Sequence, residues 1–163
     1  MPQLAIAADN TEKNGDNLQF LILALGLGGT LFYEEGHQGS IQFIQSFVSS
    51  QIITEGLKLA IDKERPNGNC CNSFPSGHAS KAFMGAGFIH KRYGLGYGMP
   101  AYIGATYVAY SRVYADKHYV EDVLAGAAIG VFSSFYFTSS YKNLEIIPVV
   151  HNGTYGINFK SQW

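Results

Sequence analysis

Charged residues are scarce in this chain, and neither sign dominates. Lysine and arginine total 11 and aspartate and glutamate total 12 among 163 residues, so the formal net charge is −1. A protein that holds nucleic acid through its surface field needs a broad positive face, which this composition does not supply. Nucleic acid is therefore not an expected partner, and any part played by cations has to be local.

Cysteine is scarcer still, and its placement excludes a common kind of metal site. The two cysteines, Cys70 and Cys71, are adjacent in the sequence. Structural zinc sites need spaced pairs of ligands, which this arrangement lacks. Neighbouring cysteines form at best a strained disulfide, so we expect two loop thiols or a redox-sensitive pair.

What the sequence does contain is three separated blocks of basic, histidine and acidic residues. In chain order they are Lys58 with Arg65-Pro66, then Pro75-Ser76-Gly77-His78, then Ser111-Arg112 with His118 and Asp122. Each block alone has a structural explanation, such as solvated charges, a helix cap or an i,i+4 pair. Together they supply the parts of a phosphoryl-transfer pocket.

Three of these residues are candidates for holding a phosphate group. Arginine offers paired planar donors and lysine a mobile point charge, which makes Lys58, Arg65 and Arg112 the candidate clamp. The Ser76 hydroxyl and the Gly77 N–H add donors, and the missing side chain of Gly77 lets an oxygen approach the backbone closely. A helix beginning here would also direct its free N–H groups at the anion.

The histidines and the aspartate supply the chemistry of hydrolysis. His118 can attack phosphorus if its reacting nitrogen is unprotonated. Asp122 lies four residues later, so on a helix it could accept the other ring N–H and fix the tautomer. His78 is then left to protonate the leaving oxygen. Because the two histidines need opposite protonation states, the sequence predicts a bell-shaped pH profile.

The pattern Lys-x6-Arg-Pro, Pro-Ser-Gly-His, Ser-Arg-x5-His-x3-Asp over residues 58–122 resembles the type 2 phosphatidic acid phosphatase superfamily. That group includes lipid phosphatases, bacterial acid phosphatases and vanadium haloperoxidases. The resemblance implies a phosphohistidine on His118, supported by Asp122, with His78 as general acid, and it implies no metal or other cofactor. It also implies that the phosphate is surrounded by Lys58, Arg65, Ser76, Gly77, Arg112 and Ser111.

The leading functional hypothesis is a metal-independent phosphatase that removes a terminal phosphate from a lipid. Three alternatives stay open at this point. They are a broad-specificity soluble acid phosphatase, a vanadate-dependent haloperoxidase and a non-catalytic phosphate-binding module. The intact set His78, His118 and Asp122 argues against the last, because binding alone needs neither a nucleophile nor an acid.

The apolar periodicity predicts a mostly α protein, a single-domain bundle of about five to six helices. We expect a flexible lead over residues 1–16, a helical phosphatase domain over 17–142 and a β-hairpin tail over 143–163. Within the domain the expected helices cover 17–33, 40–64, 77–93, 100–114 and 117–141. Pro100 is expected to open the fourth, Glu34-Glu35 to end an apolar segment in water, and Asn152-Gly153 to form the hairpin turn.

The sequence bears on membrane association in two opposing ways. Four stretches of about a bilayer's length lack charge, namely 17–33, 36–54, 93–111 and 123–141. Mean hydropathy is only +0.01, which favours a soluble or peripherally bound bundle over an integral membrane form. Ala5-Ile6-Ala7 resembles the end of a signal peptide. We therefore expect a periplasmic or membrane-associated protein of a bacterial envelope, facing outside the cytoplasm; the sequence does not define its oligomeric state.

Overall fold

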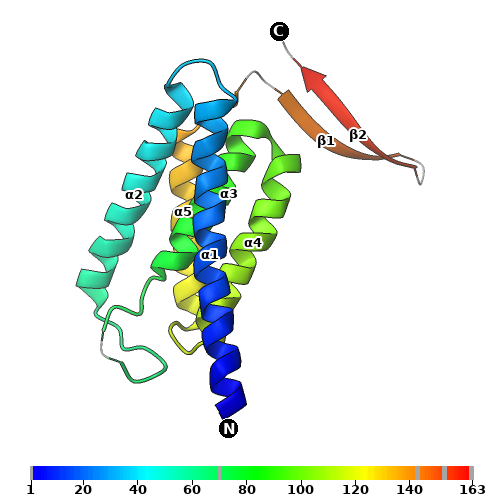
Figure 1. Cartoon of the computed structure of the whole chain (residues 1–163). Helices are drawn as coiled ribbons and strands as arrows, with labels where there is room; N and C mark the ends of the chain where they lie inside the picture. Colours follow the sequence, from blue (N-terminus) through cyan, green and yellow to red (C-terminus); the bar gives the residue numbers. More distant parts are fainter. Residues whose placement is uncertain (1, 70, 142–143, 152–153, 162–163) are drawn as a thin grey trace.

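Five α-helices make up most of the structure, a computed structural model that describes residues 2–69, 71–141, 144–151 and 154–161 (Figure 1). The helices are α1 (Pro2–Phe32), α2 (Gln38–Ile61), α3 (Gly77–Tyr93), α4 (Leu95–Tyr114) and α5 (Val120–Phe137). The predicted mostly helical bundle is confirmed, and the bounds of α3 match the expected ones. Cys70 lies outside the described residues, so the expectation for the cysteine pair stays untested.

The amino-terminal stretch is helical, which corrects the flexible lead predicted for residues 1–16. α1 begins at Pro2 and runs through the polar stretch without a break. The charges there are paired along the helix or against the bundle. Lys13 Nζ lies 2.7 Å from Asp9 Oδ2 one turn away, and Asp16 faces Arg112 of α4. The polar residues of this stretch are therefore helical, and their charged side chains have partners.

Two other helix boundaries differ from the prediction. α4 begins at Leu95 and carries Pro100 inside it, because the turn is made by Gly94. Gly94 has φ 97°, a conformation that favours glycine, and it caps both the end of α3 and the start of α4. α5 begins at Val120, since Tyr119 is extended with φ −78° and ψ 164°. His118 therefore lies in the turn before α5, not on its face.

α3 is the central helix and packs against each of the other four. Small residues on facing helices let the backbones approach closely. α5 comes nearest at two glycines, where an added Cβ would collide with the backbone oxygens of Ser76, for Gly126, and of Ser80, for Gly130. These contacts fix the amino-terminal end of α3 relative to α5.

The end of the bundle farther from Gly77 is held by a buried ion pair. The side chains of Arg92 and Glu34 are 2% and 1% exposed, and their charged atoms lie 2.5 Å apart. Arg92 also donates to the Ser139 carbonyl at 2.8 Å, and the Tyr93 hydroxyl donates to Glu34 at 2.7 Å. The prediction that Glu34 ends an apolar segment in water is therefore wrong, because Arg92 draws the carboxylate inward.

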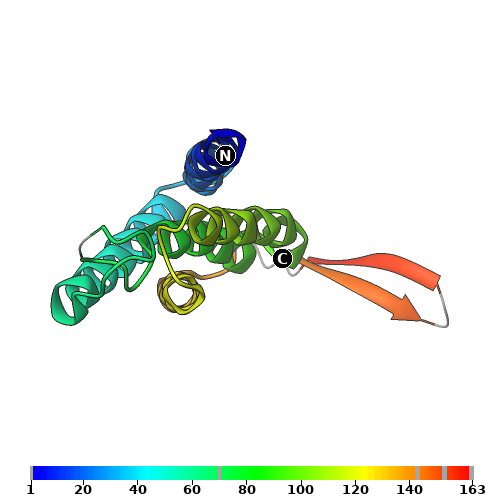
Figure 2. The same ribbon diagram turned by 90° about the horizontal axis from the view of Figure 1, so that it is seen from below.

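Two antiparallel strands follow the helices, β1 (Leu144–His151) and β2 (Thr154–Ser161). Leu144 is opposite Ser161, and His151 is opposite Thr154. The strands extend away from the helices in both views (Figures 1 and 2). The turn expected at Asn152-Gly153 lies outside the described residues, so the hairpin as a whole stays a prediction.

The outer surface of the helices is unusually apolar. Two described helical segments, Ala7–Phe32 and Val120–Phe137, are long and apolar enough to cross a membrane, and only 28% and 33% of their apolar windows is buried. Figure 2 shows α1 and α5 on opposite sides of the row formed by α2, α3 and α4. Large exposed apolar side chains occur on both and on α2 and α4, including Phe20, Leu25, Ile44, Ile52, Ile103, Leu124 and Phe132.

Candidate active site

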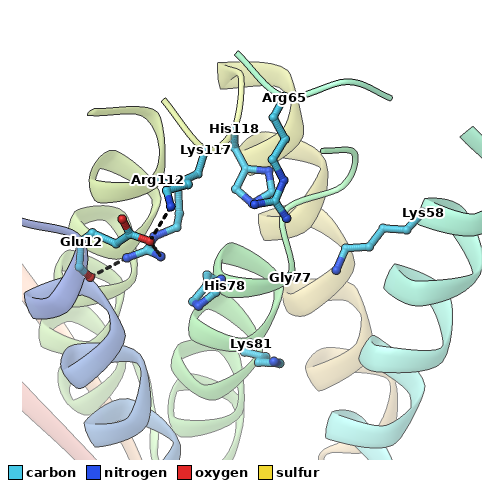
Figure 3. Close-up of a pocket in the computed structure, with 9 residues that line it drawn as sticks. All are labelled: Glu12, Lys58, Arg65, Gly77, His78, Lys81, Arg112, Lys117 and His118. Carbon is cyan, nitrogen blue, oxygen red and sulfur yellow. Dashed lines mark hydrogen bonds and ion pairs between the residues drawn. The ribbon is translucent and has the colours of Figure 1, made fainter. Parts of the chain in front are cut away.

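One pocket gathers residues from all three sequence blocks at the end of the bundle where α3 begins (Figure 3). Its volume is about 160 Å³. It is lined by Glu12, Lys58, Arg65, Gly77, His78, Lys81, Arg112, Lys117 and His118. Segments far apart in the chain therefore surround a single cavity, as the phosphate-pocket hypothesis requires.

The three candidate clamp residues reach this pocket from different elements. Lys58 extends from the last turns of α2, and its ammonium donates to Glu55 at 2.8 Å. Arg65 comes from the loop after α2, and Arg112 from the last turn of α4. A Cβ on Gly77 would lie 3.2 Å from Lys58 Nζ, so this ammonium approaches the bare backbone at Gly77 closely on the wall of the pocket. An anion placed there can contact both.

Arg65 has unused hydrogen-bonding capacity. Its Nε is buried and, among the residues that the structure describes, has no hydrogen-bond partner. A buried guanidinium donor without an acceptor is costly, and an anion in the pocket would remove that cost. The chemistry of the lining therefore fits a phosphate group.

His118 is held in one orientation by a backbone carbonyl. Its Nδ1 lies 2.7 Å from the Ser73 carbonyl oxygen, and only 5% of its side chain is exposed. A carbonyl can only accept, so Nδ1 carries the hydrogen and Nε2 of the neutral ring has its lone pair free. Burial, together with the charges of Arg65 and Lys58, lowers the pKa of His118 to about 4 against the opposing effects of Ser73 and Asp122. The imidazole is therefore neutral near pH 7.

Asp122 does not contact His118 in the way expected from the sequence. Its Oδ2 lies 3.8 Å from His118 Nδ1, beyond hydrogen-bonding distance. It accepts instead from the Ser73 hydroxyl at 2.5 Å and from the Tyr119 N–H at 2.9 Å, while Lys63 donates to its other oxygen at 2.7 Å. The contact with His118 is thus made by Ser73, and Asp122 holds Ser73 and the start of α5 in place.

His78 lies in the first turn of α3 and faces charges of both signs. Its Nε2 is 3.1 Å from Asp16 Oδ1, and Asp16 in turn is 3.0 Å from Arg112. About two fifths of the His78 side chain is exposed to solvent, so a substrate in the pocket can reach it. The two histidines line the same cavity from different parts of the chain, His78 from α3 and His118 from the turn before α5 (Figure 3).

Ser76 and Ser111 are fully buried and lie behind the pocket lining. Ser76 caps α3, with its N–H donating to the Asp122 carbonyl at 2.9 Å. Ser111 donates its hydroxyl to the Val108 carbonyl at 2.7 Å and accepts from Arg112 Nε at 3.1 Å. Both therefore support pocket residues from behind.

Several residues of the site are missed by motif reasoning. Lys81 and Lys117 add two cations to the lining, and Glu12 adds a carboxylate. Spacing could have pointed to Lys81, since it lies one turn after His78 on α3. The signal for Glu12 and Asp16 is their own i,i+4 spacing in a polar stretch. Ser73 carries no sequence signal, because it acts on His118 through its backbone.

Fold and site together define a helical enzyme that hydrolyses phosphate esters. The family model of the PAP2 superfamily matches residues 39–146. The chain belongs to the PAP2 superfamily, which confirms the resemblance carried by the three motifs and the expected class, phosphoric monoester hydrolase.

Two relatives with assigned functions are similar in sequence. The lipid A 4'-phosphatase of Helicobacter pylori is 31% identical over 170 residues, spanning 93% of this chain and 85% of that protein. The lipid A 1-phosphatase of Porphyromonas gingivalis is 38% identical over 77 residues. That second match covers 45% of this chain and 17% of the relative, so it compares only a part of each.

Two solved structures share the fold. Aquifex aeolicus LpxE superposes with a TM-score of 0.66 at 22% identity, over 84% of this chain and 86% of its own. A transmembrane PAP2 type phosphatidylglycerolphosphate phosphatase from Bacillus subtilis gives a TM-score of 0.63 at 27% identity, over 84% and 76% of the two chains.

Proposed function

We propose that this protein is a membrane-embedded lipid phosphatase that works through a phosphohistidine on His118. The observation that carries the proposal is the neutral His118 ring, whose Nδ1–H is directed at the Ser73 carbonyl while the ring lines a cation-rich pocket. This arrangement leaves Nε2 unprotonated beside the place where a phosphate would bind. Arg65, Lys58 and Arg112 would hold its oxygens as charge develops.

In the first step, His118 Nε2 forms a bond to phosphorus as the bond from phosphorus to the ester oxygen breaks. His78 gives its proton to that leaving oxygen, which departs as an alcohol. In the second step, water attacks the phosphohistidine and His78 takes one of its protons. The P–N bond breaks, inorganic phosphate leaves and both histidines return to their starting states.

A lipid substrate is supported by the relatives and by the surface. The similar proteins are named for phosphate groups on lipid A, and the Bacillus subtilis structure is that of a transmembrane lipid phosphatase. The apolar exterior of α1, α2, α4 and α5 would suit contact with acyl chains. A phosphate on a lipid headgroup, with lipid A phosphates first, is therefore the proposed substrate class.

The orientation in the membrane stays a prediction. We expect the pocket to face outside the cytoplasm. In a variant whose Cys70 and Cys71 are replaced by serine, a membrane-impermeant thiol reagent applied to intact cells would label a cysteine placed at exposed Asn72, in the loop before α3, if that orientation is correct. Labelling only after the cells are opened would contradict it.

Phosphate release from the purified protein in detergent tests the function. Substrates should include lipid A, phosphatidate, a polyprenyl diphosphate and p-nitrophenyl phosphate. We expect His118→Ala to lower kcat at least ~10³-fold on every ester that the wild type cleaves. His37→Ala, which changes an exposed histidine outside the pocket, is the matched control and should keep full activity.

Each alternative has its own outcome in this assay. Retained turnover in His118→Ala would remove the proposed nucleophile. Equal kcat/KM on lipid and soluble esters would indicate a broad acid phosphatase. Absence of phosphate release from all of them would indicate a binding module, and halide oxidation that needs both peroxide and vanadate would indicate a haloperoxidase.

A further inference from the structure

The amino-terminal half of α1 lies directly against the pocket, although it contributes nothing to the three motifs. A Cβ at Gly15 would collide with the Ser111 hydroxyl and would lie 3.0 Å from Arg112. The helix therefore approaches α4 as closely as a residue without a side chain allows. This contact brings two carboxylates, Glu12 and Asp16, to the charged end of the bundle.

α1 occupies much of the hydrogen-bonding capacity of Arg112. One terminal nitrogen of the guanidinium donates to the Glu12 carbonyl at 2.6 Å. The other lies 3.0 Å from Asp16 Oδ1 and 3.6 Å from Glu12 Oε1. The Arg112 side chain is only 2% exposed and lines the pocket, so these contacts fix the guanidinium at the pocket wall.

Asp16 also faces His78, and no other carboxylate in the described part of the chain is recorded near that ring. The other charges that act on His78 are cationic: Arg112 from α4, Lys81 from α3, Lys58 from α2 and His118 when it is protonated. Asp16 Oδ1 lies 3.1 Å from the ring Nε2. This oxygen is buried and accepts no hydrogen bond from any residue that the structure describes, so it acts on Arg112 and on His78 through its charge.

We propose that Asp16 is a positioning residue for the reaction, which couples Arg112 to His78 and favours the protonated form of His78. The inference rests on the proposed function, since it concerns the proton that His78 gives to the leaving oxygen. A carboxylate beside an imidazole stabilises the imidazolium, which burial and the surrounding cations oppose. Glu12 differs, because it contacts Arg112 and Lys117 and no contact between it and His78 is recorded among the described residues.

The test compares leaving groups that differ in their need for a proton. An alkyl phosphate requires protonation of the departing oxygen, whereas p-nitrophenolate leaves readily without it. We expect Asp16→Asn to lower kcat at least ~10-fold on an alkyl phosphate and less than ~3-fold on p-nitrophenyl phosphate. The alkaline limb of kcat/KM for the alkyl ester should move about one pH unit lower, and Asp16→Glu should restore part of both.

Asp9→Asn is the matched control, because Asp9 lies on the same helix and pairs only with Lys13 among the contacts recorded for it. It should change neither readout. If Asp16→Asn does not fold, Asp16→Ser provides a second neutral side chain with the same expectation. Equal losses on both esters with no movement of the alkaline limb would overturn the proposal and leave the phosphatase function standing. A wild-type protein that releases no phosphate would overturn both.

Discussion

The site depends at the residue scale on which atom accepts the Nδ1 hydrogen of His118. The acceptor is the Ser73 carbonyl, which has no proton to exchange and keeps the neutral ring in one tautomer. Asp122 acts one step away by binding the Ser73 hydroxyl and the Tyr119 N–H. Asp122 thus holds Ser73 in place, and the Ser73 carbonyl in turn holds the His118 ring.

The lowered pKa of His118 predicts the acid side of the pH profile. Burial and the nearby cations place it at about 4, so the ring loses its free Nε2 lone pair only when pH falls through that value. Because kcat/KM reports ionisations of the free enzyme, its value for p-nitrophenyl phosphate should fall about tenfold for each pH unit below the pKa of His118. Arg65→Gln removes one of the charges that lower this pKa, so its acid limb should lie at higher pH.

The measurement is kcat/KM against pH, with activity recovered at neutral pH as the check on folding. An acid limb of the wild-type protein near the ordinary histidine pKa of 6.5 would contradict the assignment.

Motif reasoning predicts the residues that must bind the same anion, because their order and spacing are constrained together. Lys58, Arg65 and Arg112 all line the pocket that the three blocks suggest. It cannot predict Ser73, whose contribution is a backbone oxygen placed by the path of a loop. Nor can it predict Asp16, because the partner of a carboxylate on α1 is known only once α1 is packed on α4.

At the scale of elements, the glycines of α5 set its distance from α3. A Cβ at Gly130 would collide with the Ser80 carbonyl and lie 2.6 Å from the Met84 nitrogen. These are backbone atoms of a central helix, so they cannot move aside alone. Close packing of this pair is what holds Ser76 and Asp122 together at the pocket end.

Gly130→Ala should therefore destabilise the protein by roughly 1–3 kcal/mol through overpacking. Gly56→Ala is the control, because Gly56 is exposed on α2 and nothing described lies within 4 Å of an added Cβ. It should be neutral or stabilising by up to about 1 kcal/mol. Thermal unfolding in detergent compares the two, and equal midpoints would contradict the packing argument.

Helix ends are predicted from the sequence only where local chemistry decides them. The start of α3 after Ser76 and its end before Gly94 follow from a cap and from a glycine, and both match the structure. The start of α1 does not follow, since polar residues are read as coil unless their partners are known. Pro100 does not open α4 as predicted, because the chain turns at Gly94 and the helix begins directly after it.

The whole molecule has an inverted distribution of polarity. Hydroxyl side chains such as Ser50, Thr54 and Ser80 are fully buried and bond one another, while large apolar side chains face outward. A mean hydropathy of +0.01 averages over this arrangement and hides it. The average favours a soluble bundle, whereas the placement of the residues supports the integral form that we propose.

Alkaline carbonate treatment of membranes tests this placement. We expect the protein to remain in the pellet and to enter solution only with detergent, because burying the outer apolar surface in lipid is favourable. A carboxyl-terminal tag followed by immunoblotting measures the distribution. Release by carbonate alone would show that the bundle does not span the bilayer.

The buried pair Arg92–Glu34 has a mechanical consequence for how a lipid could enter. It ties the loop between α1 and α2 to α3 and, through Ser139, to the segment after α5. Any movement of α1 away from α4 must then begin at the opposite end, where Asp16 and Glu12 contact Arg112 of α4. An incoming phosphate dianion would compete with these two carboxylates for Arg112, so its arrival would loosen α1 from α4 at the pocket end while the Arg92–Glu34 end stays fixed.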